Sequence, residues 1–333
     1  MKKHLQWSIF FIICLLFTPL EAVDYTKKGE VQSFIQMMHK RYGFKTKTLS
    51  LWFHGVRKHT RVPYRKKHYY YHGESHSSGS WDRYAYQYLK RTGGGVYFMR
   101  KFHDTLKRAS KKYGIPPEYI TAIIGIESNY GMNRGDYFVF DRLVHLAFDK
   151  GDRRAKFYKK ELIALLRLAA AEKIDPREIQ GSSSGAIGLA QFMPSTYKSF
   201  AVDFNHDGKK RMNNVSDAVG SIANYFYRHH WHKGEDVAVR VRYEGECFNA
   251  LPTGIKKSYN RRDLEGIEPR EPFNYHGKVY LIKLERNSYD ELWYGGWNFY
   301  VITRYNHSSY YAMSVHQLAQ KIKRSYQRRY GKF

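Results

Sequence analysis

The strongest constraint on this chain is an apolar helical stretch that ends in a glutamate, at residues 115–131 (IPPEYITAIIGIESNYG). Two prolines stand at its start, where a proline in the first turn loses no intrahelical hydrogen bond. Ile120, Ile124 and Glu127 fall at positions i, i+4 and i+7, so they share one face of the helix. Gly131 is expected to end the helix. A carboxylate therefore completes an otherwise apolar stripe.

A carboxyl group in this position is a candidate general acid. Desolvation and the negative C-terminal end of a helix both raise the pKa of a carboxyl group, and no cation is adjacent to Glu127 in the sequence. A carboxylic acid that keeps its proton near neutral pH can donate it in catalysis. A buried glutamate paired with a distant Lys or Arg is the alternative, and this stretch alone leaves it open.

The chain has 333 residues, which is enough for a large core or for several packed subdomains. Its 57 Lys and Arg residues against 30 Asp and Glu residues give a formal charge of +27. A surface of this kind favours polyanions such as nucleic acid, anionic lipid or an acidic cell-wall polymer. The charge alone does not choose among them.

Residues 1–22 are typical of a cleavable secretory signal: a basic start, an apolar run at residues 7–17, and Ala22 at the cleavage site. The run is short for a membrane span, and an uncleaved anchor is the alternative. Cys14 lacks the sequence context of a lipoprotein signal, so no lipid anchor is expected. After cleavage Cys247 is the only cysteine, which excludes an internal disulfide. Export also disfavours nucleic acid as the partner.

Apolar periodicity predicts a mainly helical chain with one late β region. The predicted helices are residues 31–43, 49–56, the second half of 81–112, 156–172 and 309–324. Residues 236–302 change to β character, and strands are expected at 236–243, 278–285 and 297–305. Residues 57–80 are basic and rich in Tyr and His, which predicts an exposed loop without compact metal-ligand spacing. His229, His230 and His232 are expected to end a helix rather than to bind zinc.

A second motif, residues 181–194 (GSSSGAIGLAQFMP), combines glycines with polar side chains. Glycines allow backbone to approach a ligand closely, and the Ser and Gln side chains offer hydrogen-bonding groups. A Gly/Ser linker that runs into a helix explains the same residues equally well. This motif alone therefore does not predict a binding site, and the other motifs of the chain have to decide.

A third motif, DFNHDGK, resembles the calcium loop of EF-hands. Asp203, Asn205 and Asp207 stand at loop positions 1, 3 and 5, and a glycine stands at position 6. Position 12 requires glutamate and is Asn214 here, but Asp217 follows three residues later and is expected to supply the missing carboxylate. The alternative is a surface loop of Asx turns.

In this order the motifs resemble the B-type lytic murein transglycosylases, exported bacterial enzymes that cut the glycan strands of peptidoglycan. The resemblance runs from about residue 31 to residue 322 and is carried by GIPPEYITAIIGIESNYG, SSGAIGLAQFMPSTYKSFAVDFNHDG, DAVGSIANYF and ITRYNHSSYYAMSV. It implies a mainly α (α+β) fold: a lysozyme-like helical core with an α subdomain and a small inserted β subdomain. The expected division is a signal peptide (1–22), an N-terminal α subdomain (23–95) with the basic loop (57–80), a catalytic core (96–235) with the EF-hand-like loop (203–217), a β subdomain (236–302) and a C-terminal segment that completes the groove (303–333).

The same resemblance assigns the site residues. It makes Glu127 the single catalytic acid and base. The residues that it places around the sugar groove are Tyr84, Ser182, Gln191, Tyr225, Tyr305, Asn306 and Tyr311. Tyr84 matches less directly, because its spacing to Glu127 differs from the family's by a small deletion. A structural Ca²⁺ ion would be held by Asp203, Asn205, Asp207, the carbonyl of Lys209 and Asp217, and no cofactor is expected for the chemistry.

The implied function is an exported, periplasmic lytic transglycosylase that cleaves the β-1,4 bond between N-acetylmuramic acid and N-acetylglucosamine and leaves a 1,6-anhydro end. Peptidoglycan strands are the expected partner of a monomeric chain, and peripheral association with the membrane or a wall complex stays open. Two alternatives also stay open. One is a hydrolytic muramidase that uses Asp136 or Asp141 as a second carboxylate. The other is a peptidoglycan-binding protein without catalysis.

Overall fold

The computed structural model describes residues 22–58, 60–61, 80–149, 153–245 and 248–333. These residues belong to two compact units, one that ends at Thr60 and one that begins at Arg61. The predictions that fall outside the described residues concern the signal segment, most of the basic stretch 57–80 with His68, His72 and His76, and the two cysteines Cys14 and Cys247. No helix of the described residues is long and apolar enough to cross a bilayer.

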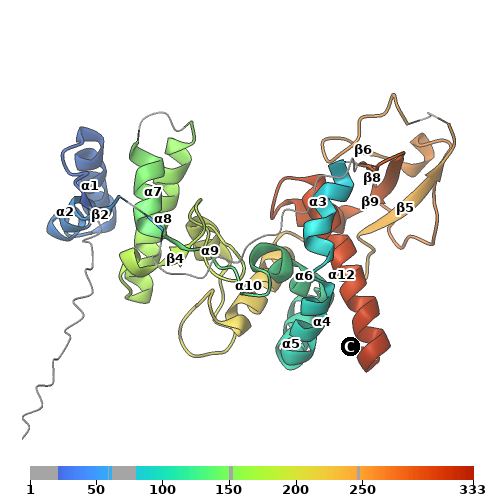
Figure 1. Ribbon diagram of the computed structural model, residues 1–333, viewed down its shortest axis with the longest axis horizontal. Helices are drawn as coiled ribbons and strands as arrows, with labels where there is room; N and C mark the ends of the chain where they lie inside the picture. Colours follow the sequence, from blue (N-terminus) through green and yellow to red (C-terminus); the bar gives the residue numbers. More distant parts are fainter. Residues whose placement is uncertain (1–21, 59, 62–79, 150–152, 246–247) are drawn as a thin grey trace, which may run out of the picture. The chain divides into compact units, whose positions relative to one another are not determined.

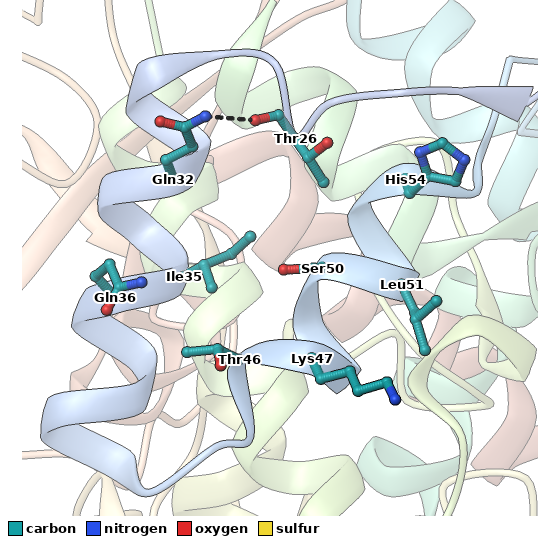
Figure 2. Close-up of a pocket in the computed structure, with 9 residues that line it drawn as sticks. All are labelled: Thr26, Gln32, Ile35, Gln36, Thr46, Lys47, Ser50, Leu51 and His54. Carbon is teal, nitrogen blue, oxygen red and sulfur yellow. Dashed lines mark hydrogen bonds between the residues drawn. The ribbon is translucent and has the colours of Figure 1, made fainter.

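The first unit is a pair of short helices, α1 (Gly29–Tyr42) and α2 (Thr46–His54), next to a small antiparallel pairing of β1 (Ala22–Val23) with β2 (Val56–Arg57). Gly43 ends α1 with a φ of 72°, as predicted, because glycine adopts the left-handed conformation without steric cost. An open groove of about 620 Å³ is lined by both helices. Figure 2 shows the residues that line it, among which Gln32 donates a hydrogen bond to the carbonyl of Thr26. No residue predicted for the active site lines this groove.

The second unit is organised around one buried helix, α6 (Pro117–Ser128). The other helices of this unit are α3 (Ser80–Leu89), α4 (Thr92–Lys101), α5 (His103–Tyr113), α7 (Val139–Phe148), α8 (Ala155–Glu172), α9 (Pro194–Phe200), α10 (Val215–Arg228), α11 (Trp297–Thr303) and α12 (Ser309–Tyr330). α4, α5, α10 and α12 all pack against α6. Every residue of α6 is buried except Glu127, which is half-buried. The core therefore surrounds one helix whose single accessible side chain is the predicted acid.

The C-terminal end of α6 differs from the prediction. The helix ends at Asn129, with a φ of 48°, and Tyr130 and Gly131 also have positive φ values of 57° and 88°. Asn tolerates the left-handed conformation because its short polar side chain can hydrogen-bond locally. Three consecutive left-handed residues turn the chain sharply just after Glu127.

A five-stranded antiparallel sheet forms the late β region, in the order β6 (Ser258–Tyr259), β8 (Val279–Glu285), β9 (Asp290–Gly295), β5 (Ala238–Tyr243) and β7 (Ile267–Pro269). Val239 and Val241 of β5 are buried, as their alternation predicted. A separate pairing joins β3 (Tyr137–Phe138) to β4 (Gln180–Gly181), and two short 3₁₀ helices lie at Pro176–Glu178 and Arg261–Asp263. In Figure 1 the sheet lies beside α3 and the start of α12, whereas α4 packs along the C-terminal half of α12.

The strand predicted at residues 297–305 is wrong, because most of this run forms α11. A short apolar run rich in aromatic and β-branched residues does not distinguish a strand from a buried helix. Here Asn298 fixes the helix start, since its side chain exchanges hydrogen bonds with both backbone groups of His232 at 2.8 Å. The first half of residues 81–112, which was not expected to be helical, contains α3. Within the sheet, β6, β7 and β9 were not predicted. The mainly α fold with a small β subdomain is confirmed.

Candidate active site

Glu127 occupies the last turn of α6 and is held by one hydroxyl group. Tyr311, in the first turn of α12, donates a hydrogen bond of 2.6 Å to Oε1 of Glu127. Burial raises the pKa of Glu127 from 4.5 to about 7, against the opposing effects of Tyr311 and of the Arg91 guanidinium. This carboxyl group can therefore carry a proton near neutral pH and release it, as a general acid must.

Three tyrosines form a wall on the α12 side of Glu127. Tyr305 stacks on Tyr311 with ring centroids 6.4 Å apart, and Tyr225 meets Tyr305 edge to face at 4.9 Å. Tyr305 donates to the carbonyl of Ala190, and Tyr225 donates to the carbonyl of Arg304, both at 2.6 Å. Burial raises the pKa of Tyr225 to about 12, and burial together with the Glu127 charge raises the pKa values of Tyr305 and Tyr311. The three hydroxyl groups therefore stay protonated and fixed.

Tyr84 approaches the same site from α3. Burial is the largest cause that raises the pKa of Tyr84, and the neighbouring Tyr88 and the Glu127 charge raise it further. Its ring lies 5.5 Å from that of Tyr88, 5.6 Å from that of Tyr310 and 6.4 Å from that of Trp81. These last three aromatic residues were missed, although the spacing of Trp81, Tyr84 and Tyr88 at i, i+3 and i+7 was visible as one face of a helix.

The other predicted groove residues lie in loops. The hydroxyl oxygen of Ser182 accepts hydrogen bonds from the backbone of Ser184 (3.3 Å) and Ala186 (3.0 Å). Gln191 directly follows Ala190, whose carbonyl accepts the hydrogen bond from Tyr305. The side-chain nitrogen of Gln191 donates to the carbonyl of Gly188 at 2.8 Å.

Asn306 is exposed in the loop between α11 and α12, directly after Tyr305. No contact described for the chain joins Ser182 or Asn306 to Glu127. The structure thus brings Tyr84, Tyr305 and Tyr311 to the carboxyl group. Of the loop residues, Gln191 and Asn306 directly follow Ala190 and Tyr305, which a hydrogen bond joins.

Arg91 is a functional residue that the sequence reasoning missed. Its guanidinium donates to the carbonyls of Gly125 (2.6 Å) and Ile126 (3.1 Å), which lie directly before Glu127. The backbone carbonyl of Arg91 accepts a hydrogen bond of 2.9 Å from Tyr130. A cation at the C-terminal end of a helix compensates the unpaired carbonyl groups there. Arg91 therefore positions the end of α6 and moderates the pKa of Glu127.

The ring of Tyr130 fits a slot made by glycines of α4 and α6. A Cβ atom on Gly94 would lie 2.7 Å from this ring, and a Cβ on Gly125 would lie 2.6 Å from the Tyr130 hydroxyl. Separations this short are not tolerated, so glycine is required while Tyr130 keeps its place. Tyr130 therefore connects the left-handed turn after Glu127 to Arg91, because its ring lies in this slot and its hydroxyl group donates to the Arg91 carbonyl.

The two carboxylates proposed for a hydrolytic mechanism have other partners. Asp136 forms an ion pair with Arg61 at 3.1 Å. Asp141 is fully buried in the first turn of α7 and acts electrostatically on Arg177. Among the described residues, only Tyr311 and Arg91 oppose the effect of burial on the pKa of Glu127. No described carboxylate is therefore coupled to Glu127.

The loop predicted to bind calcium joins α9 to α10 and is folded by its own oxygen atoms. Asp203 accepts hydrogen bonds from the backbone of Asp207 (3.1 Å) and of Gly208 (2.8 Å). The Asp207 carboxylate accepts a hydrogen bond of 2.9 Å from the backbone N–H of Lys209. The backbone N–H of Asp207 donates a hydrogen bond of 3.3 Å to the side-chain oxygen of Asn205. Gly208 has a φ of 81°, which suits the sharp turn at position 6 of such a loop.

Asp217 closes this loop from the start of α10. It is fully buried and accepts hydrogen bonds from the backbone of Phe204 (2.8 Å) and of Arg211 (2.7 Å). The Arg211 guanidinium lies 3.0 Å from Oδ2 of Asp207, so a protein cation neutralises this carboxylate. In the described part of the chain no three Asp, Glu, His or Cys side chains are grouped closely enough to hold a metal ion. The all-oxygen donor set suits Ca²⁺, which would need Asp207 to turn away from Arg211.

Comparison with known proteins agrees with this arrangement. The family described as the transglycosylase SLT domain matches residues 26–320. The membrane-bound lytic murein transglycosylase B of Escherichia coli (strain K12) is 41% identical over 249 residues, which cover 74% of this chain and 68% of that protein.

Two solved structures have the same fold as this chain. The E. coli lytic transglycosylase Slt35 in complex with calcium has a TM-score of 0.82 at 35% identity, covering 92% of this chain and 96% of that one. SltB1 from Pseudomonas aeruginosa has a TM-score of 0.77 at 36% identity, covering 89% of this chain and 99% of that one. The chain therefore belongs to the lytic murein transglycosylases with a transglycosylase SLT domain.

Proposed function

We propose that this enzyme cleaves the β-1,4 bond between N-acetylmuramic acid and N-acetylglucosamine in peptidoglycan without consuming water, with Glu127 as the only catalytic carboxyl group. One observation carries the proposal: the single accessible side chain of the buried helix α6 is a carboxyl group with a pKa raised to about 7. Its partners are a hydroxyl group and a guanidinium. A lone acid of this kind can serve one reaction first as acid and then as base.

In the first step, protonated Glu127 gives its proton to the glycosidic oxygen as the bond to C1 breaks. The 2-acetamido group of the substrate stabilises the positive charge that develops at C1. In the second step, ionised Glu127 takes the proton of the muramyl 6-hydroxyl group, whose oxygen attacks C1. The product is a 1,6-anhydro end, and Glu127 regains the proton that it gave. Atoms balance without water or a cofactor.

Among the described residues, no second carboxylate acts on Glu127 as the paired carboxylate of most glycosidases would. Such enzymes hold a second carboxylate as nucleophile or as base for water. Asp136 is paired with Arg61, and Asp141 is fully buried within α7. This arrangement favours attack by the substrate's own hydroxyl group over hydrolysis.

The remaining groove residues bind the sugar in this proposal. The fixed rings of Tyr84, Tyr305 and Tyr311 present apolar faces and polar edges, which suit the two kinds of surface on a sugar. Ser182, Gln191, Tyr225 and Asn306 supply hydrogen bonds along the groove. Each contact made more strongly in the transition state than in the ground state would accelerate the reaction.

The loop after α9 is proposed to bind a structural Ca²⁺ ion. The ligands would be Asp203, Asn205, Asp207, the Lys209 carbonyl and Asp217. The support comes from the oxygen donors, from the φ of 81° at Gly208 and from the calcium complex of Slt35. The ion would brace the loop against α10 and would take no part in bond cleavage.

Export completes the proposed function. The first 22 residues carry the pattern of a secretory signal, and the substrate of lytic murein transglycosylases is the cell wall. We therefore place the mature, monomeric enzyme in the periplasm. The formal charge of +27 would hold the acidic wall polymer or a membrane surface in a manner that salt weakens.

Digestion of purified sacculi tests the role of Glu127. The wild-type enzyme and the Asp136→Asn variant should both release soluble muropeptides, whereas Glu127→Gln should release none. Gln preserves the shape of the side chain but cannot donate a proton to the glycosidic oxygen. The assignment would be rejected if Glu127→Gln released muropeptides. It would also be rejected if a folded Asp136→Asn variant released none.

A further inference from the structure

A second cavity lies at the opposite end of α6 from Glu127. It has a volume of about 580 Å³, within the range of small-molecule sites. Its walls come from the first turn of α6, the middle of α12 and the sheet strands β5 and β9. Tyr119 marks its position on α6, about 12 Å along the helix axis from Glu127. None of the predicted groove residues lines this cavity, which we name the α6–sheet pocket.

His316 provides the pocket with a prearranged hydrogen-bond donor. The residue is 7% exposed and lines the pocket, and its Nδ1 lies 2.8 Å from the hydroxyl group of Tyr119. Gln320 donates to that hydroxyl oxygen at 3.2 Å, so the Tyr119 proton points to Nδ1. Burial lowers the pKa of His316 to about 4, so the ring is neutral. With the Tyr119 proton directed at Nδ1, the proton of the neutral ring stands on Nε2, for which the described hydrogen bonds give no partner.

Aromatic side chains form the apolar walls of the pocket. Trp231 lies 5.2 Å from Tyr119, and Trp293 meets the His316 ring edge to face at 5.9 Å. The indole N–H of Trp293 donates to buried Glu291 at 2.8 Å. The indole orientation is thus fixed before any ligand enters. Two indoles and a phenol around one donor are typical of sugar recognition, because they cover the apolar faces of a sugar ring.

The charge of the pocket distinguishes it from the rest of the molecule. Its lining contains four acidic residues, Glu118, Glu235, Asp236 and Glu271, and three basic residues, Arg240, Arg270 and Lys323. With His316 neutral, the acidic residues of the lining outnumber the basic ones by one, in a chain whose formal charge is +27. The pocket therefore offers no excess of positive charge to a polyanion, and a neutral ligand suits it.

We propose that the α6–sheet pocket is a second sugar-binding site, which takes a neutral N-acetylated hexosamine unit apart from the catalytic groove. The acetamido carbonyl accepts the hydrogen bond from Nε2 of His316, and the sugar ring packs on Trp231 and Trp293. A glycan strand or a released fragment held there would raise the local concentration of substrate. The site needs no chemistry from Glu127, so it stands even if the proposed reaction fails.

The test is calorimetric titration of the Glu127→Gln protein with an N-acetylglucosamine tetrasaccharide. The substitution removes the catalytic acid, so the sugar is bound without being cleaved. Gln320→Phe, added to this protein, projects a ring into the pocket while keeping His316. Gln327→Phe is the matched control, because Gln327 is exposed on the same helix and does not line the pocket. We expect the pocket site to weaken at least tenfold in the first variant and to be unchanged in the second.

Two further variants separate the pocket from the groove. Tyr305→Ala should weaken sugar binding in the catalytic groove and leave binding in the α6–sheet pocket unchanged. This result does not depend on which reaction the enzyme catalyses. His316→Gln keeps a donor and should retain more affinity than His316→Leu. Binding that is identical in Gln320→Phe and in Gln327→Phe would overturn the proposal. So would a pocket that binds a wall-type tripeptide and not the tetrasaccharide.

Discussion

The hydroxyl group of Tyr311 lies 2.6 Å from Oε1 of Glu127 and joins the first turn of α12 to the last turn of α6. This contact makes the two oxygen atoms of the carboxyl group unequal. Oε1 accepts the hydrogen bond from the Tyr311 hydroxyl group, so the acidic proton of neutral Glu127 is carried by Oε2. We infer that Oε2 is the atom that gives its proton to the glycosidic oxygen.

Replacing Tyr311 by Phe should shift the pH dependence of the enzyme. The hydrogen bond favours ionised Glu127, so its loss should raise the pKa of Glu127 above 7. The alkaline limit of kcat/KM should move upward with it, while the rate falls because the carboxyl group loses its orientation. An unchanged alkaline limit in pH profiles of muropeptide release would contradict this role.

The Arg91 guanidinium is predicted to position α6 rather than to touch the substrate. Arg91→Lys keeps the charge but loses the guanidinium Nη1, which donates to the carbonyls of both Gly125 and Ile126. We expect the free energy of unfolding to fall by about 1–2 kcal/mol and kcat to fall with little change in KM. Chemical denaturation and steady-state kinetics measure the two effects. Exposed Arg329, changed to Lys in the same helix bundle, is the control, and equal effects in both variants would reject the assignment.

Glu127 should also destabilise the protein as the pH rises. Its folded pKa of about 7 lies above the ordinary 4.5, so the folded state binds this proton more tightly than the unfolded state. The stability that the proton provides is complete below pH 4.5 and is lost as the pH rises through 7. Glu127→Gln should therefore gain stability relative to wild type over this window, by up to about 3 kcal/mol. Thermal unfolding at several pH values checks this, with exposed Glu265→Gln as the control. A pH-independent difference would contradict the raised pKa.

Calcium should stabilise the folded protein through the loop after α9. A ligand that binds only the folded state adds about 2.7 kcal/mol at a hundredfold excess over its Kd. The melting temperature should rise with Ca²⁺ and much less with Mg²⁺, which demands a tighter octahedral site. Asp203→Asn should abolish the rise, whereas Asp104→Asn, at a side chain that is 97% exposed, should not. A rise that survives Asp203→Asn would place the ion elsewhere.

The sequence predicted those parts of the site that depend on local pattern. The apolar stripe of α6 placed Glu127 correctly, because helical periodicity and buried surface are properties of one segment. The end of the same helix was misplaced by two residues, since Asn129 takes the left-handed turn before Gly131 does. The groove tyrosines came from the family resemblance rather than from any pattern, because α12 and α6 meet only in three dimensions.

Arg91 illustrates what the sequence could not predict. It lies 36 residues before Glu127 and within an unremarkable basic segment, and its role exists only because α4 packs against α6. The error at residues 297–305 has a different cause, because a short and mainly apolar run suits a buried helix as well as a strand. Long-range contacts decided both cases.

Cleavage of purified sacculi in H₂¹⁸O tests the central claim most directly, because it asks whether water enters the product. The account predicts that wild-type muropeptides carry 1,6-anhydro ends, weigh one water less than reducing sugars and contain no ¹⁸O at C1. Glu127→Gln should give no product. Reducing ends labelled with ¹⁸O would contradict the account, because a water molecule and not the muramyl hydroxyl group would then have attacked C1.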